Sequence, residues 1–291
     1  MRSQETTGRT PMRVLIAGCG YVGEALARQL MDAGDQVWGL RRSVELLPAG
    51  IIPVAADLHR PETLRDLPAD LDVSIYCAAA ESWHDESYRR AYVEGPTHWL
   101  EALARNQTKP PRVVFTSSTG VYHQADGSWV DEDSATEPSG FSGRRMLEGE
   151  AVVRRWPGEA VILRLGGIYG PGREGLLDRV RRGDAVLAGP PPHYANRIHR
   201  DDAAAALAHL ARLPSPEAIY LGVDEEPADR DLVLTYLAQR LDLPAPRRNS
   251  DPSSLAPRGN KRGSSARLRG SGFEFRYPSY RQGYDELIAQ A

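Results

Sequence analysis

Short apolar runs alternate with longer amphipathic stretches over the first two-thirds of the chain. The runs that predict strands cover residues 14–17, 37–40, 51–55, 73–77, 113–116 and 161–165, and the clearest helical stretches are 88–104 and 147–155. Parallel strands need long crossover connections, so this alternation predicts a parallel sheet with helices on both faces. The expected fold class is α/β, with a doubly wound sheet.

The pattern changes after residue 165, where glycine and proline at 170–172 and 189–192 separate short segments. A helix at 201–212 and a strand at 218–221 are expected to return to the main sheet. A further helix is expected at 230–241 and a long loop at 244–265. We therefore predict a main domain of residues 12–169, completed by 196–225, and a smaller substrate lobe of residues 170–195 and 226–291. A cleft between them, at the carboxyl ends of the strands, is the expected ligand site.

Size and charge exclude several classes of protein. A chain of 291 residues with 41% hydrophobic composition can bury a substantial core, so disorder of the whole chain is excluded. The net charge of -3 has interspersed signs and gives no long-range field for nucleic acid or an acidic membrane. Apolar runs fall short of the roughly 20 residues needed to cross a bilayer. We expect neither a nucleic-acid nor a membrane partner.

The first residues and the cysteines point to the compartment. Residues 1–11 are polar, lack the apolar core of a signal peptide and are expected to be a flexible leader. Cys19 and Cys77 have neither metal-ligand spacing nor the density of a disulfide scaffold. A reducing, cytoplasmic setting without a protein-bound metal fits both observations.

A glycine motif follows the first strand and opens a helix. Its sequence is Gly18-Cys19-Gly20-Tyr21-Val22-Gly23. Gly18 suits a tight turn, Gly20 lets the backbone approach a pyrophosphate, and Gly23 permits close packing of helix on strand. The helix beginning near Tyr21 directs its amide dipole at the phosphates. These features predict a Rossmann-type NAD(P)-binding domain in which residues 18 and 20–23 hold the cofactor.

Arg41 and Arg42 end the second predicted strand, where a dinucleotide enzyme commonly carries an acid for the adenosine ribose. Arginine offers a bidentate fork to a 2′-phosphate, so NADP(H) is favoured over NAD(H). The alternative is a pair of solvated arginines. Asp57 can contact the adenine amino group or cap a following helix. Ala78 and Ala79 supply the small side chains that a cofactor crossing a strand end needs.

The order of motifs resembles that of the extended short-chain dehydrogenases/reductases, the group that includes nucleotide-sugar epimerases and dehydratases. The resemblance covers residues 12–291 and rests on the glycine motif and on four later segments: 92–95 (YVEG), 115–122 (FTSSTGVY), 163–172 (LRLGGIYGPG) and 197–202 (RIHRDD). It implies that Ser117 lies beside the cofactor. It also suggests a homodimer formed through the helices near 88–104 and 147–155.

The resemblance implies a catalytic serine, matched by Ser118, and a tyrosine followed four residues later by a lysine. Ser118 can orient a substrate carbonyl or simply cap the strand end. Aligning the Leu147-x-x-Glu150 signature places Ser142 at the tyrosine position and Met146 at the lysine position, and a shift of one residue pairs Phe141 with Arg145. Neither register supplies a phenol. A general acid contributes about 10²- to 10⁴-fold, so another group must supply this effect or it is absent.

Several residues are candidates to replace the missing groups. Tyr122 and His123 directly follow the serine motif, and a histidine has a suitable pKa for proton transfer. The alternatives are a packing role for Tyr122 and a solvent-facing loop position for His123. Trp83, Ser142, Arg197 and His199 are expected to face the substrate. For His199 the alternative is packing beneath the acidic residues that start the next helix.

Two functions remain open on the sequence. The first is an atypical NADP(H)-dependent oxidoreductase or epimerase-like enzyme that acts on a small-molecule carbonyl, imine or nucleotide-sugar-like substrate. The second is a catalytically silent sensor that responds to NADP(H) by closing its lobes.

Overall fold

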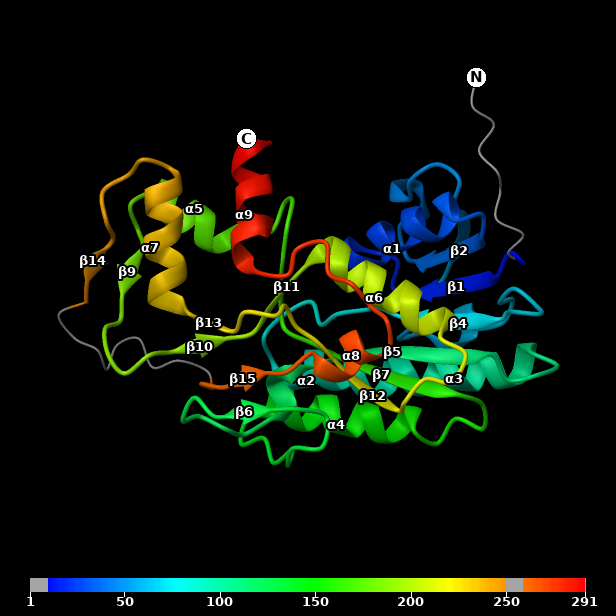
Figure 1. The fold of residues 1–291 in the computed structure, drawn as a ribbon. Coiled ribbons are helices and arrows are strands. Elements are labelled where there is room, and N and C mark those ends of the chain that lie inside the picture. Colours follow the sequence, from blue (N-terminus) through cyan, green and yellow to red (C-terminus); the bar gives the residue numbers. More distant parts are fainter. Residues whose placement is uncertain (1–9, 250–258, 291) are drawn as a thin grey trace, which may run out of the picture.

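A seven-stranded parallel sheet forms the centre of the molecule, which a computed structural model describes over residues 10–249 and 259–290 (Figure 1). The strand order is β12-β7-β5-β4-β1-β2-β3. Its strands are β1 (Arg13–Ala17), β2 (Gln36–Arg41), β3 (Ile52–Ala55), β4 (Val73–Tyr76), β5 (Arg112–Ser118), β7 (Ala160–Leu165) and β12 (Ile219–Gly222). The predicted α/β fold with a doubly wound parallel sheet is confirmed.

Side chains of β1 alternate between the two faces of the sheet. Val14 and Ile16 belong to one apolar cluster, while Leu15 and Ala17 belong to another on the opposite face. This period of two is the geometry of an extended strand, and burial of both faces explains why the sequence is a continuous apolar run.

Helices cover both faces. On one face α1 (Tyr21–Asp32) and α6 (Arg200–Arg212) pack against each other and share the first cluster with the sheet. On the other lie α3 (Gly95–Asn106) and α4 (Phe141–Val153), and both contribute to the second. The order reverses between β1 and β4, so a crevice opens at the carboxyl ends of these strands.

A separate apolar cluster joins three helices from distant parts of the chain: α5 (Gly175–Arg181), α7 (Arg230–Arg240) and α9 (Tyr280–Ala289). Figure 1 shows them gathered at the left, away from the large sheet. Two-stranded pairings accompany them, formed by β9 (Val186–Leu187) with β14 (Arg247–Arg248) and by β10 (Tyr194–Ala195) with β13 (Ala228–Asp229). These helices and strands come from the two segments, 170–195 and 226–291, that the sequence assigns to the smaller lobe.

One part of the tail departs from that expectation. Leu268 of α8 (Ala266–Gly270) and the following Phe273 are buried in the cluster on the α1 and α6 face of the main sheet. Residues 266–273 therefore belong with the main domain, because they complete its apolar layer. Nearby, β15 (Arg262–Gly263) pairs with β6 (Trp129–Val130), and β8 (Gly167–Tyr169) pairs with β11 (Arg197–His199).

The helix predicted at 88–104 is interrupted. It consists of α2 (Asp85–Arg89), a π-helical turn η3 (Arg90–Glu94) and α3. Short 3₁₀ turns are η1 (Val44–Leu46), η2 (Pro61–Leu64) and η4 (Thr119–Val121). Most of the predicted leader and residues 250–258 of the predicted loop lie outside the described residues. Over the described ranges, the helices are too short or too polar to cross a bilayer.

Candidate functional site

A cavity of about 730 Å³ lies at the carboxyl ends of the central strands. Its walls bring together the glycine turn, the end of β2, the loops after β3 and β4, the end of β5, and residues of α2, η3 and α4. Ile168 and Arg173 close it from the side of the smaller lobe. Segments separated by more than a hundred residues in sequence therefore face one space.

The glycine turn has the geometry of a dinucleotide cradle. Gly18 has a φ of +82°, and a Cβ placed on it would lie 2.4 Å from the backbone nitrogen of Ala78. At Gly20 a Cβ would meet nothing within 4 Å, so this stretch of backbone is open to a ligand. At Gly23 it would lie 3.1 Å from the carbonyl oxygen of Gly18, which explains the close packing of α1 on the turn.

Arg41, the last residue of β2, and Arg42 both line the cavity, and each pairs with an acidic side chain. Arg41 donates to Oε1 of Glu24 at 2.9 Å and to the carbonyl oxygen of Cys19 at 3.3 Å. Arg42 lies 2.7 Å from Oε1 of Glu81, and both of these side chains are 63% exposed. An ion pair this exposed contributes at most about 1 kcal/mol, so Arg42 can exchange its partner for a ligand anion.

Most of the other residues predicted to bind the cofactor also line the cavity. Tyr21, Val22, Asp57, Ala78 and Ala79 are on its wall. The carboxylate of Asp57 accepts a hydrogen bond from the backbone nitrogen of His59 at 2.9 Å, which is a local turn and not the helix cap considered from the sequence.

The two serines at the end of β5 have different roles. Ser118 lines the cavity, and its Oγ accepts a hydrogen bond from the backbone nitrogen of Gly120 at 3.0 Å. This contact fixes the oxygen as an acceptor and leaves the hydroxyl proton available to a ligand. Ser117 also contributes to the wall, but its hydroxyl donates to Glu150 at 2.7 Å. The hydroxyl of Ser117 therefore serves the buried network beside the cavity.

Tyr122 belongs to that network, contrary to its expected catalytic role. It is 2% exposed, lies outside the cavity lining, and its hydroxyl accepts a hydrogen bond from Nη1 of Arg164 at 2.9 Å. Burial raises the pKa of Tyr122 to about 12. The packing alternative considered from the sequence describes this residue.

Three further candidates lie away from the cavity lining. His123 is an exposed loop residue beyond η4. The ring of Trp83 is 47% exposed and packs against Tyr88 and Phe141, with centroids 5.1 Å and 5.4 Å away. Ser142 lies in the first turn of α4 without reaching the cavity wall. The structure thus does not bring these side chains to the site.

Arg197 and His199 are buried beside the smaller lobe instead of facing a substrate. Arg197 donates to the carbonyl oxygen of Ala195 at 3.0 Å. His199 caps α6, because its Nδ1 accepts a hydrogen bond from the backbone nitrogen of Asp201 at 3.2 Å. Burial lowers the pKa of His199 to about 4, which keeps the ring neutral as an acceptor.

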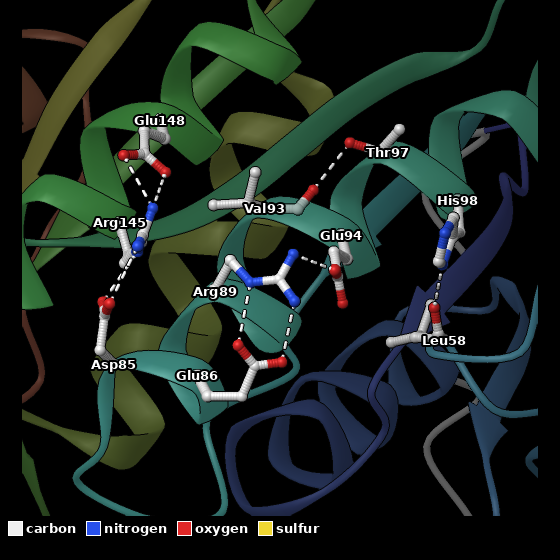
Figure 2. A network of polar contacts seen from close by, with 10 residues as sticks. All are labelled: Leu58, Asp85, Glu86, Arg89, Val93, Glu94, Thr97, His98, Arg145 and Glu148. Atoms are coloured by element: carbon white, nitrogen blue, oxygen red, sulfur yellow. Dashed lines mark hydrogen bonds and ion pairs between the residues drawn. The ribbon is translucent and has the colours of Figure 1, made fainter.

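The α4 residues aligned with the family lysine do not supply a cation to the cavity. Met146 lines the wall and is 4% exposed. In the shifted register, Arg145 is held in ion pairs at 2.8 Å with Asp85 of α2 and with Glu148 (Figure 2).

Two residues that line the cavity were not predicted from the sequence as catalytic candidates. Tyr92 of the π-helical turn lines the cavity, and so does Arg173, which follows β8. Tyr92 stood in the sequence only as part of a family motif. A helical pattern of period 3.6 carries no signal for the inserted residue of a π turn, so its direction was not predictable.

These features define a dinucleotide-binding α/β protein: a glycine turn, an open helix N-terminus and a crevice at the switch point of a doubly wound sheet. Residues 14–221 match the model of the NAD dependent epimerase/dehydratase family. The chain belongs to this family, and its resemblance to the extended short-chain dehydrogenases/reductases is confirmed.

Relatives cover nearly the whole chain. Protein YeeZ of Escherichia coli K12 is 33% identical over 279 residues, which are 91% of this chain and 96% of the relative. The 2-alkyl-3-oxoalkanoate reductase of Stenotrophomonas maltophilia is 28% identical over 78% of this chain and 75% of its own length. A solved structure from Methylobacillus flagellatus, described as of the NAD-dependent epimerase/dehydratase type, is 38% identical with a TM-score of 0.81, covering 97% and 99% of the two chains. The family and these names support an oxidoreductase- or epimerase-type enzyme with a nicotinamide dinucleotide cofactor.

Proposed function

We propose that the protein is an NADP(H)-dependent reductase of a small-molecule carbonyl or imine. The observation that carries this proposal is the single cavity that joins the glycine turn, two arginines at the end of β2 and the hydroxyl of Ser118. One space therefore offers a cradle for a pyrophosphate, positive charge for a 2′-phosphate and a hydrogen-bond donor for a substrate oxygen. The relative named as a reductase supports the same reaction class.

The preference for NADP(H) rests on charge at the ribose end of the cavity. Arg42 is exposed and held by a weak pair with Glu81, so a 2′-phosphate can displace that carboxylate. Arg41 is less free, since Glu24 neutralises it at 2.9 Å. Arg42 is therefore expected to contribute more of the discrimination than Arg41.

When bound, the reduced cofactor supplies the hydride for the reaction. The chain's own part is to bind and orient. Gly18 lets the turn pass close to Ala78, Gly20 leaves the backbone open to the phosphates, and Ser118 has a hydroxyl proton to donate to the substrate oxygen. Donation from Ser118 stabilises negative charge that develops on this oxygen.

Calorimetry with NADPH and NADH tests the cofactor assignment. We expect tighter binding of NADPH, with the advantage reduced about tenfold in Arg42→Gln because one charge-assisted contact contributes about 1.5 kcal/mol or more. Arg60→Gln is the matched control, since Arg60 is also an exposed arginine beside Asp57 but lies outside the cavity lining. Equal binding of NADPH and NADH by the wild type would contradict the NADP(H) preference.

A second function, a sensor that binds NADP(H) without turnover, is favoured by one observation. Met146 presents a thioether to the cavity where the family motif calls for a cation. NADPH consumption with a panel of aldehydes, ketones and imines separates the two functions. Consumption with any of these compounds supports the reductase, whereas tight binding without consumption across the panel supports the sensor.

A further inference from the structure

The π-helical turn η3 is held by contacts from several directions, and Tyr92 lies at its centre. The hydroxyl of Tyr76 donates to the carbonyl oxygen of Ala91 at 2.5 Å, and Oγ1 of Thr97 donates to that of Val93 at 2.7 Å. On the other side, a Cβ placed on Gly149 of α4 would lie 2.0 Å from the carbonyl oxygen of Tyr92. Only a glycine allows α4 to approach the turn this closely.

Ion pairs between charged side chains also stabilise this turn (Figure 2). Arg89 pairs with Glu86 one turn earlier and with Glu94 across the π turn, five residues on. Residues five apart share a face only in a π-helix, so this second pair suits the widened turn. The pair of Arg145 with Asp85 ties α4 to α2. Such turns are rare and are frequently found at functional sites.

The redirected side chain is the phenol of Tyr92. It lines the cavity that also contains Ser118 and packs against the cluster that includes Met146. Its hydroxyl oxygen accepts a long hydrogen bond of 3.4 Å from the backbone nitrogen of Ala80, which leaves its proton available for donation. A phenol thus stands on the wall where neither register of α4 provides one.

Arg173 lines the same cavity as the phenol of Tyr92. Its guanidinium carbon lies 4.4 Å from the centroid of the Tyr21 ring. Burial raises the pKa of Tyr92, while the hydrogen bond from Ala80 and the charge of Arg173 lower it. The net shift is upward, so the phenol is protonated at neutral pH, which is the state a proton donor requires. Arg173 stabilises the phenolate that remains after donation.

We propose that Tyr92 is the proton donor of this site and that Arg173 is its positioning cation, the two residues together replacing the tyrosine and lysine of the family motif. This inference rests on the proposed reductase function. The carbonyl carbon gains a hydride from the reduced nicotinamide cofactor, which is oxidised, and the carbonyl π electrons move to oxygen. The O–H bond of Tyr92 breaks as its proton joins that oxygen, and water later returns a proton to the phenolate.

Tyr92→Phe tests the donor, because it removes one hydroxyl and keeps the ring contacts with Tyr88. The substrate probe is 9,10-phenanthrenequinone, an activated dicarbonyl, together with any compound reduced in the panel. We expect turnover to fall about 100-fold with unchanged binding of NADPH. Tyr88→Phe is the control, since Tyr88 is a neighbouring tyrosine outside the cavity lining, and it should keep wild-type turnover.

A second readout does not depend on turnover. The difference in phenolate absorption between the wild type and Tyr92→Phe, followed against pH, isolates the ionisation of Tyr92. We expect NADP⁺ to shift this ionisation to lower pH, because its nicotinamide ring is positively charged. We expect Arg173→Gln to shift it to higher pH and Arg173→Lys to restore most of the wild-type behaviour.

The outcomes separate this inference from the proposed function. If calorimetry detects no binding of NADPH by the wild type, or if the wild type reduces no probe, the reductase function is wrong. If the wild type reduces the quinone and Tyr92→Phe does so at the same rate, Tyr92 is not the donor. An ionisation of Tyr92 that is indifferent to NADP⁺ also overturns the inference, whatever the turnover.

Discussion

Arg164 and Glu150 form a bidentate ion pair in the interior, with Nε and Nη2 of the arginine 2.9 Å and 2.8 Å from the two carboxylate oxygens. Both side chains are nearly inaccessible to solvent. Ser117, Tyr122 and Arg154 add further hydrogen bonds to this pair, so the network joins β5, β7, α4 and the residue after η4. The sequence marked Glu150 only as part of a helix signature, whereas in the structure it is the buried partner of Arg164 and of the cavity residue Ser117.

The pair predicts a large loss of stability in Glu150→Gln. The variant leaves the Arg164 charge buried without its counter-charge, and breaking a buried pair in this way costs about 3–5 kcal/mol. Chemical denaturation measures the free energy of unfolding. Glu148→Gln is the control on the same helix, because Glu148 is 46% exposed and its ion pair should contribute less than about 1 kcal/mol. Similar losses in the two variants would contradict the assigned role of Glu150.

Gly149→Ala should disturb the π turn. The new methyl group would meet the carbonyl oxygen of Tyr92, a backbone atom that cannot move by rotating a side chain. We expect a loss of about 1–3 kcal/mol, typical of overpacking, and a lower turnover because Tyr92 shifts. Denaturation and the quinone assay measure the two effects. At Gly175 of α5 a Cβ meets nothing within 4 Å, so Gly175→Ala should lower neither the stability nor the turnover. A stable, fully active Gly149→Ala protein would show that the turn tolerates a wider spacing from α4.

His199 predicts a loss of stability in mild acid. Its pKa of about 4 in the folded protein lies below the ordinary value of 6.5, so the unfolded chain binds the extra proton first as the pH falls. The stabilisation is complete above pH 6.5 and is lost toward pH 4, by about 2 kcal/mol between pH 7 and pH 5. His199→Asn keeps a helix-capping side chain but cannot titrate, so its stability should fall less over this interval.

The comparison with His199→Asn matters because Asp202 opposes the trend. Burial raises the pKa of Asp202 to about 6, so its contribution to stability increases as the pH falls. The Asp202 effect is common to both proteins and cancels in their difference. Parallel stability curves for wild type and His199→Asn would show that His199 does not carry the predicted proton linkage.

The two cysteines should resist alkylation in the native protein. Burial raises the pKa of Cys19 to about 12, and it also raises the pKa of the Cys77 thiol. The thiolate is the reactive form, so at pH 8 iodoacetamide should label neither residue at an appreciable rate. Mass spectrometry of native and denatured samples measures this, with two labels expected after unfolding. Rapid native labelling of Cys19 would indicate that the glycine turn opens.

The sequence predicted the main sheet well because its strands are buried apolar runs separated by helices of ordinary period. The positions of Gly18, Arg41 and Ser118 followed from the same regularity, since Arg41 and Ser118 each end a strand and Gly18 directly follows one. Tyr122 and His123 do not face the cavity as the sequence suggested. The 3₁₀ turn η4 separates them from the end of β5, so they do not continue the direction of that strand. Tyr92 was missed because a π turn and the close approach of Gly149 depend on contacts between distant segments.

The position of α8 has a consequence for how the molecule can be divided. Leu268 and Phe273 belong to the apolar cluster of α1 and α6, although in the chain they lie between α7 and α9 of the smaller lobe. Truncating the protein after β12 would leave an apolar hollow on the nucleotide-binding half. The nucleotide-binding domain therefore depends on residues from the C-terminal part of the chain. Proteolytic removal of residues 266–273 should weaken binding of the coenzyme as well as binding of a substrate.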